Sequence, residues 1–189
     1  DAWLLVDFPG YGDCQGAPNP ERIRESFRTV IPLAAKELGW DSNPDPAKLR
    51  FFGHSLGGAA CLIAASEFKI QRGVLIAPFT STMEMSRVVT GLPVGFLVWH
   101  RFDNVSRMNE LAKRGPGSVY ILHGVNDEVI PVDMSGRLAK AHPEIVHLTE
   151  VPNGFHNDIQ SNHAGFVAEA LEITGKQNAP SREGRGVER

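Results

Sequence analysis

The stretch Gly53-His54-Ser55-Leu56-Gly57 places a serine hydroxyl where a buried strand is expected to turn into a helix. A strand–turn–helix of this kind holds the serine in a strained backbone conformation at the edge of a sheet. The amino end of the following helix favours negative charge that develops there. We expect glycine to be needed at both 53 and 57 because a Cβ at either position would clash with the neighbouring strand or helix. Ser55 is therefore the candidate nucleophile, and the alternative is a glycine-rich turn with an incidental serine.

A serine hydroxyl is a poor nucleophile at neutral pH, so the chemistry requires a base, and imidazole suits this role because its pKa lies near neutrality. His156 is the candidate because it follows the last predicted strand, residues 145–151, in a loop at the carboxyl edge of the sheet. His163 is its rival, although it is expected to be exposed at the start of a helix. His54 is expected to pack or hydrogen-bond and His123 to be structural. Surface positions are expected for the remaining histidines, His100, His142 and His147, and no metal-ligand spacing appears among the seven.

The base needs an acid to orient it, and the loop after the predicted strand at 118–122 offers Asp127. Ser55, Asp127 and His156 then follow one another in the order serine, acid, histidine, which suits a nucleophile on a strand–turn–helix. Asp127 is preferred to Glu128, which is followed directly by apolar residues, while Glu128 and Asp133 remain rivals. The alternative for Asp127 is a turn former or a helix cap, which is compatible with the catalytic role.

Strand and helix patterns alternate along the chain, which predicts an α/β fold with a parallel sheet and helices on both faces. Strands are expected at residues 3–6, 49–52, 74–76, 118–122 and 145–151. Helices are expected at residues 20–38, with a kink or break at Pro32 and an end at Gly39, and at 56–68, 132–141 and 163–174, with Gly175 as the stop of the last. Residues 79–114 form a mixed, partly helical insertion.

The composition indicates one soluble globular domain, because 42% of the 189 residues are hydrophobic and 22% are charged. A net charge of −3 is too small to favour nucleic acid as a partner. Cys14 and Cys61 suggest neither a disulfide framework nor a metal site, and Cys61 is expected in the core. The longest apolar run, residues 92–99, is too short to cross a membrane, and the segment lacks the basic helical face that favours membrane contact. The sparse cysteines make the cytoplasm the default expectation.

Several motifs together resemble the α/β-hydrolase superfamily, and within it the BEM46-like branch, which is related to the ABHD-type hydrolases. They are Val6-Asp7-Phe8-Pro9-Gly10-Tyr11-Gly12, the serine turn with Gly58 added, Ala77-Pro78-Phe79-Thr80-Ser81, His123-Gly124 with Asp127 and Pro131, and His156-Asn157-Asp158. Pro9 departs from the branch, in which arginine is common at this position. The similarity covers about residues 2–174, and it implies an α/β-hydrolase core at 1–175 with a cap insertion at about 79–114. The polar tail at 176–189 is expected to be disordered.

The resemblance also implies the roles of the site residues and a missing part. Ser55, Asp127 and His156 correspond to the catalytic triad, and the backbone N–H of Leu56 to one donor of the oxyanion hole. The second donor and the first strands of the fold have no counterpart in this sequence, so the resemblance predicts an amino-terminally truncated member. Loss of one such donor costs on the order of 10²- to 10³-fold in turnover. We therefore expect the chain alone to be a weak hydrolase at best and poorly stable.

The predicted function is hydrolysis of an ester or related acyl bond in a small-molecule substrate, through an acyl-enzyme and without a cofactor or metal. Phe79, Met83, Phe96 and Trp99 are candidates for an apolar substrate pocket, and the alternative is that they pack a cap against the core. A non-catalytic relative that keeps the fold for binding, or an inactive fragment, is the alternative function. The sequence leaves the acyl group, the leaving group and the oligomeric state open.

Overall fold

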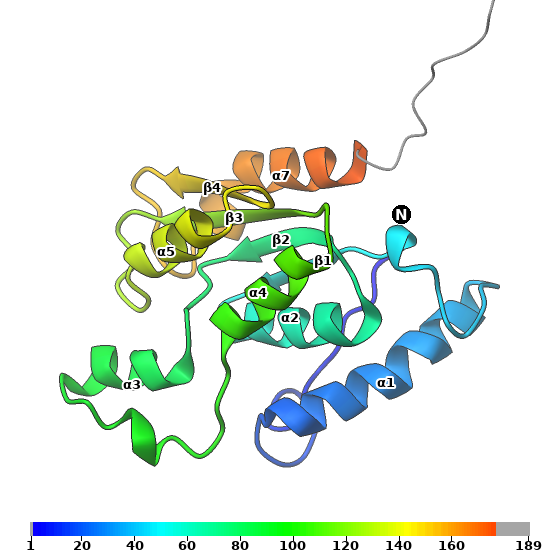
Figure 1. Cartoon of the computed structure of the whole chain (residues 1–189), viewed down its shortest axis with the longest axis horizontal. Helices are drawn as coiled ribbons and strands as arrows, with labels where there is room; N and C mark the ends of the chain where they lie inside the picture. Colours follow the sequence, from blue (N-terminus) through cyan, green and yellow to red (C-terminus); the bar gives the residue numbers. More distant parts are fainter. Residues whose placement is uncertain (1, 177–189) are drawn as a thin grey trace, which may run out of the picture.

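The computed structural model describes residues 2–176, which form a layered α/β structure around one parallel sheet (Figure 1). Its strands are β1 (Phe51–His54), β2 (Arg72–Ile76), β3 (Ser118–Gly124) and β4 (Val146–Val151). They lie in the sheet in the order β1-β2-β3-β4, and every neighbouring pair is parallel. The predicted parallel sheet is therefore confirmed. Beyond Lys176, the tail for which the sequence predicts disorder lies outside the described residues.

Helices cover both faces of the sheet, as the sequence predicts. The helices α2 (Leu56–Phe68), α4 (Asn104–Lys113) and α5 (Asp133–Ala141) pack on one face, where Leu75 points. The other face, where Val74 and Ile76 point, is covered by α7 (Ala164–Lys176) and the single turn α6 (Ile159–Asn162). Alternate strand residues point to opposite faces, so these consecutive apolar residues serve both cores.

The helix α1 (Pro20–Glu37) packs against the outer side of α2 through Ile23 and Phe27. The Asn19 side chain caps it by accepting a hydrogen bond from the Glu21 N–H at 2.8 Å. Pro32 does not break the helix. Residues on either side of the proline, Ile31 and Ala35, are both buried, and this packing offsets the hydrogen bond that the proline ring removes.

The strand predicted at residues 3–6 does not form. Trp3 and Leu5 are largely exposed, at 62% and 87% of their maximum, and the Trp3 ring lies nearly perpendicular to that of Phe52, with 6.0 Å between ring centroids. Within residues 2–176, no backbone hydrogen bond joins this segment to β1. An apolar run indicates a preference for burial, whereas a strand also requires a partner for its backbone groups.

The segment 79–114 contains α3 (Thr82–Thr90), the 3-10 turn η2 (Gly95–Leu97) and α4. Figure 1 shows α3 projecting from the body of the molecule, while α4 lies against α2. Met108 and Leu111 of α4 are fully buried in the core beneath the sheet. A cap spanning all of 79–114 remains a prediction.

The remaining elements differ from the sequence predictions only in detail. A 3-10 turn, η1 (Pro46–Lys48), precedes β1. The last helix, α7, runs through Gly175 to Lys176, because Gly175 does not take up the left-handed backbone that ends a helix. Gly39, by contrast, has φ +70° just beyond α1 and ends that helix as predicted. Within residues 2–176, every helix falls short of the length or hydrophobicity needed to cross a bilayer.

Candidate active site

Ser55 stands at the sharp turn between β1 and α2, with the left-handed value φ +52° that a non-glycine residue rarely adopts. Its N–H donates to the Ile76 carbonyl at 2.8 Å, which ties the turn to the end of β2. A Cβ on Gly53 would lie 2.6 Å from the Gly57 carbonyl oxygen, so glycine is required at position 53. A strained backbone therefore occurs at the residue whose hydroxyl is the candidate nucleophile.

The prediction that Gly57 is equally required by close packing is wrong. A Cβ built on Gly57 meets no described atom within 4 Å, because this residue faces a pocket rather than the sheet. The close approach of α2 to the sheet instead involves Gly58, whose added Cβ would touch Leu75 at 3.4 Å.

Asp127 follows β3, and its side chain is fully buried. One carboxylate oxygen, Oδ1, accepts the N–H groups of Val129 at 2.9 Å and Ile130 at 2.8 Å. The other, Oδ2, lies 2.8 Å from Nδ1 of His156 and 3.2 Å from Nε2 of His123. The turn-forming role and the orienting role therefore occupy different oxygens of the same carboxylate.

Two opposing effects act on the pKa of Asp127. Burial alone would raise the pKa, but hydrogen bonds from His123, Ile130, His156 and Val129 together hold it well below its ordinary value of 3.8. The carboxyl group is therefore ionised at neutral pH and can only accept hydrogen bonds.

His156 lies in the loop after β4 and is almost completely buried. Since the Asp127 carboxylate is an acceptor, Nδ1 of His156 must carry the proton in their 2.8 Å hydrogen bond. In the neutral ring, Nε2 is then left with its lone pair free to accept a proton, as a general base requires.

The rivals of these residues lie elsewhere or act differently. The Glu128 carboxylate accepts the backbone N–H of His156 at 3.2 Å and so contacts the main chain of the base rather than its ring. Asp133 is exposed and pairs with Arg137 at 2.9 Å. The side chain of His163 is partly exposed, and its Nε2 lies 3.9 Å from a carboxylate oxygen of Asp158. Among residues 2–176, no three metal-ligating side chains group closely enough to hold a metal ion.

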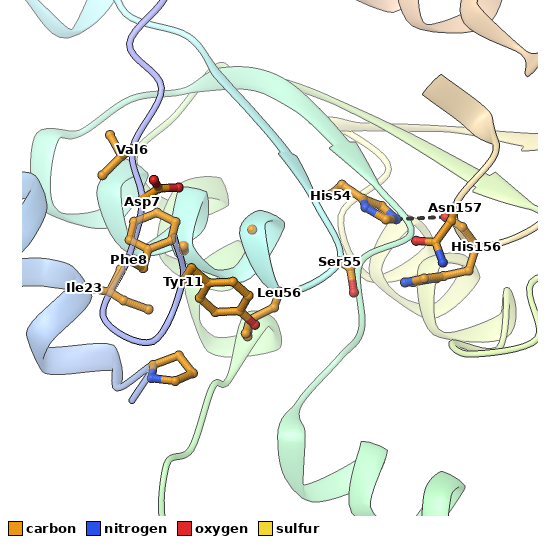
Figure 2. Close-up of a pocket in the computed structure, with 13 residues that line it drawn as sticks. Val6, Asp7, Phe8, Tyr11, Ile23, His54, Ser55, Leu56, His156 and Asn157 are labelled. Atoms are coloured by element: carbon orange, nitrogen blue, oxygen red, sulfur yellow. Dashed lines mark hydrogen bonds between the residues drawn. The ribbon is translucent and has the colours of Figure 1, made fainter. Parts of the chain in front are cut away.

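Ser55 and His156 line one open pocket of about 370 Å³. Figure 2 shows a ring nitrogen of His156 on the side that faces Ser55. No hydrogen bond joins the Ser55 hydroxyl to the His156 ring, and the Leu56 N–H donates to no acceptor within the described part of the chain. As the first residue of α2, Leu56 presents this N–H at the positive end of the helix.

The pocket walls come from the segment before α1, from the serine turn and from the loop of His156 (Figure 2). Its lining residues are Val6, Asp7, Phe8, Tyr11, Pro18, Ile23, His54, Ser55, Leu56, Gly57, Ala60, His156 and Asn157. The four residues predicted to bind substrate are not among them. Phe79 is buried in the core beside α1 and α2, while Met83, Phe96 and Trp99 lie exposed on the projecting segment.

Sequence reasoning missed the contribution of Phe8 and Tyr11 to the pocket. Their segment follows the run at 3–6 in a loop rich in glycine and proline, and a loop at the carboxyl edge of a parallel sheet is where ligand contacts gather. The position of this loop in the sequence could therefore have indicated that Phe8 and Tyr11 line the pocket.

No known family model matches the chain. An uncharacterized protein of Mycobacterium tuberculosis, Rv2307c, is 32% identical over 157 residues, which cover 82% of this chain and 53% of that protein. The uncharacterized membrane protein YNL320W of Saccharomyces cerevisiae is 28% identical over 175 residues, which cover 89% of this chain and 60% of its own length. The chain thus spans little more than half the length of these curated relatives.

Several of the solved structures that resemble the chain are hydrolases. A puromycin-hydrolyzing peptidase of Mycobacterium tuberculosis matches 88% of this chain and 26% of its own, with a TM-score of 0.62 and 19% identity. Est1E of Butyrivibrio proteoclasticus with bound ferulic acid matches 90% of this chain and 74% of its own, with a TM-score of 0.59 and 19% identity. The chain has an α/β-hydrolase fold. At these identities, the likeness establishes the fold and leaves the activity to the chemistry of the site.

Proposed function

We propose that the chain carries the active site of a serine hydrolase that cleaves an ester or related acyl bond in a small substrate. Ser55 is the nucleophile, His156 the general base and Asp127 the orienting acid. The observation that carries the proposal is the 2.8 Å contact between Asp127 Oδ2 and His156 Nδ1, in a ring that borders the pocket of Ser55. Three separate loops supply a strained serine, an oriented imidazole and a buried carboxylate. Together these groups can catalyse acyl transfer.

In the first half of the proposed reaction, the Ser55 oxygen attacks the substrate carbonyl while Nε2 of His156 accepts the hydroxyl proton. The Asp127 carboxylate keeps the Nδ1 proton in place and stabilises the imidazolium that forms. The oxyanion of the tetrahedral intermediate accepts the free N–H of Leu56 at the start of α2. The intermediate collapses when its bond to the leaving group breaks, and Nε2 of His156 returns the proton to that group.

In the second half, water replaces the leaving group. The water oxygen attacks the acyl carbonyl while His156 accepts a proton from the water. His156 then protonates the Ser55 oxygen as the acid product departs. Water and ester are the only reactants consumed. A pocket of about 370 Å³ fits a small acyl or alcohol group, and its aromatic and aliphatic walls favour an apolar one.

The comparisons support the reaction class. Several structural neighbours are esterases, Est1E binds ferulic acid, and one neighbour is a peptidase that hydrolyses puromycin. The sequence motifs around Asp7, Ser55, Asp127 and His156 further support assignment to the BEM46-like branch.

A fluorophosphonate probe tests the proposal, because it reacts covalently only with an activated serine. We expect labelling of the folded chain, or of a longer natural protein that contains it, at Ser55, and loss of labelling in Ser55→Ala. Ser86→Ala is the matched control, since the Ser86 hydroxyl donates only to the Met83 carbonyl on the projecting helix α3. Absence of labelling in a folded protein would instead favour the non-catalytic binding alternative.

A further inference from the structure

His54, the residue directly before the nucleophile, is joined to the base by a hydrogen bond to its main chain. The His54 ring is half-buried, and its Nε2 lies 2.8 Å from the backbone carbonyl oxygen of His156, as the dashed line in Figure 2 marks. A carbonyl oxygen can only accept, so Nε2 of His54 carries the proton. The two rings lie side by side, with centroids 4.7 Å apart.

The main chain of His156 is held at its other end as well. Its N–H donates to the Glu128 carboxylate at 3.2 Å, next to the acid Asp127. His54 thus supplies the link from the serine turn, and Glu128 supplies the link from the acid loop. The ring of His156 can turn only about its own side-chain bonds while both links hold.

We propose that His54 is a positioning residue, which sets the distance between the Ser55 hydroxyl and the His156 ring by donating its Nε2 proton to the His156 carbonyl. This inference rests on the proposed function of the site. It explains why a histidine stands in the variable position of the serine turn, where its side chain points toward the base loop.

The rigidity of the surrounding backbone makes this link effective. His54 ends β1 and pairs in register with Ile76, and the Ser55 N–H donates to the same residue's carbonyl. The nucleophile and the donor therefore share one fixed support, and the loop of His156 is the part that must be brought to them. A displacement of about 1 Å at such a site costs on the order of 10²-fold in rate.

The protonation state of His54 suits this role. Its pKa is lowered from the ordinary value of 6.5, because burial disfavours the charged ring and the neighbouring His156 repels a second positive charge. The neutral Nε2–H tautomer can donate to the carbonyl without placing a charge beside the imidazolium that forms on His156.

The rate of labelling by a fluorophosphonate probe tests the proposal in three proteins. His54→Phe keeps a ring of similar shape beside His156 but removes the donor, and we expect labelling to slow by about 10- to 100-fold. His54→Gln offers an amide N–H in place of the imidazole. It should recover at least half of the lost labelling rate, measured on a logarithmic scale. Equal rates in wild type and His54→Phe would overturn the proposal, as would a His54→Gln variant no faster than His54→Phe.

A double-mutant cycle separates positioning from general stability. If His54 acts through His156, then His54→Phe should slow labelling no further in a His156→Ala background, whereas a full additional loss would refute the link. Thermal unfolding of each variant shows that it is folded. If wild-type protein shows no labelling at Ser55 at all, it is the proposed function that fails, not this inference.

A measurement that needs no activity completes the test. The nitrogen-15 spectrum of the histidine rings in the whole chain should show His54 as the Nε2–H tautomer at neutral pH, with a proton protected from exchange with water. An Nδ1–H tautomer, or a ring proton in free exchange, would overturn the hydrogen bond and with it the proposal, whether or not the variants fold.

Discussion

The main chains of Gly124 and Gly154 touch where the acid loop leaves β3 and the base loop leaves β4. A Cβ on Gly124 would overlap the Gly154 carbonyl, and the same carbonyl accepts the Asn126 N–H at 2.9 Å. This contact brings the two loops close enough for Asp127 to reach His156.

We predict that Gly124→Ala forces the loops apart. It should lower the free energy of unfolding by about 1–3 kcal/mol, as overpacking does, and reduce labelling of Ser55. Gly136→Ala in α5 is the control, because an added Cβ there meets no described atom within 4 Å. That change should stabilise the helix by about 0.5–1 kcal/mol. Chemical unfolding of both variants checks the pair, and a Gly124→Ala protein as stable as wild type would contradict the close contact.

Asp127→Asn preserves the shape of the acid but reverses its hydrogen bonding. The amide can donate to Nδ1 of His156, which moves the ring proton to Nε2 and removes the base. We expect hydrolysis of a small ester to fall by about 10³- to 10⁴-fold. Asp133→Asn, at an exposed carboxylate paired with Arg137, should leave the rate unchanged. Steady-state kinetics measures both, and similar rates in the two variants would rule out Asp127 as the acid.

Stability should fall as the solution is acidified, in two ranges. The pKa of His54 is lowered in the folded state, so protonation favours unfolding, and its contribution is complete above about pH 6.5 and lost as the pH falls through the lowered value. The pKa of Asp127 is also lowered, so its contribution is complete above about pH 4 and lost under stronger acid. Urea unfolding between pH 8 and pH 5 should therefore show a shallower decline in His54→Phe than in wild type. Parallel curves would contradict the shift at His54.

Substrate affinity should depend on the pocket that the structure shows rather than on the projecting segment. Tyr11 lines this pocket, while Trp99 is 91% exposed and lies outside it. We expect Tyr11→Ala to raise KM for a small aryl ester by about 3- to 10-fold with a smaller change in kcat, and Trp99→Ala to leave KM unchanged. A larger KM effect at Trp99 would restore the sequence-based assignment of the pocket.

The two cysteines should differ in reactivity. Burial raises the pKa of the Cys61 thiol to about 12, and its Sγ donates to the Phe52 carbonyl at 3.2 Å, while Cys14 is exposed. Since the thiolate is the reactive form, a disulfide reagent near pH 8 should modify one thiol in the folded chain and two after denaturation. Rapid modification of both in the folded state would show that Cys61 is not shielded.

Much of the fold could be predicted from local patterns. Alternating strand and helix signals give the parallel sheet, and Asn19 with Pro20 marks the start of α1. Residues 3–6 show the limit of such patterns. Their apolar character is local information, but strand formation depends on a partner elsewhere in the chain.

The candidate site also has a part that the sequence predicts and a part that it does not. The pairing of Asp127 with His156 could be anticipated because parallel strands bring their carboxyl ends to one edge, so the loops after β3 and β4 must lie close together. Neither the contact of His54 with the His156 carbonyl nor the exposure of Phe96 and Trp99 leaves a trace in residue spacing. Both depend on how a loop folds over its neighbours, which periodicity does not encode.

The sheet adds its strands from one side in the order in which they occur in the sequence. During synthesis on the ribosome, the sheet can therefore grow by adding strands at one edge. The serine turn after β1 is synthesised long before His156. Until the loop after β4 is released, the nascent polypeptide has no His156 beside the Ser55 hydroxyl. On the proposed function, this strand order delays the activation of Ser55 until β4 and the His156 loop have been synthesised.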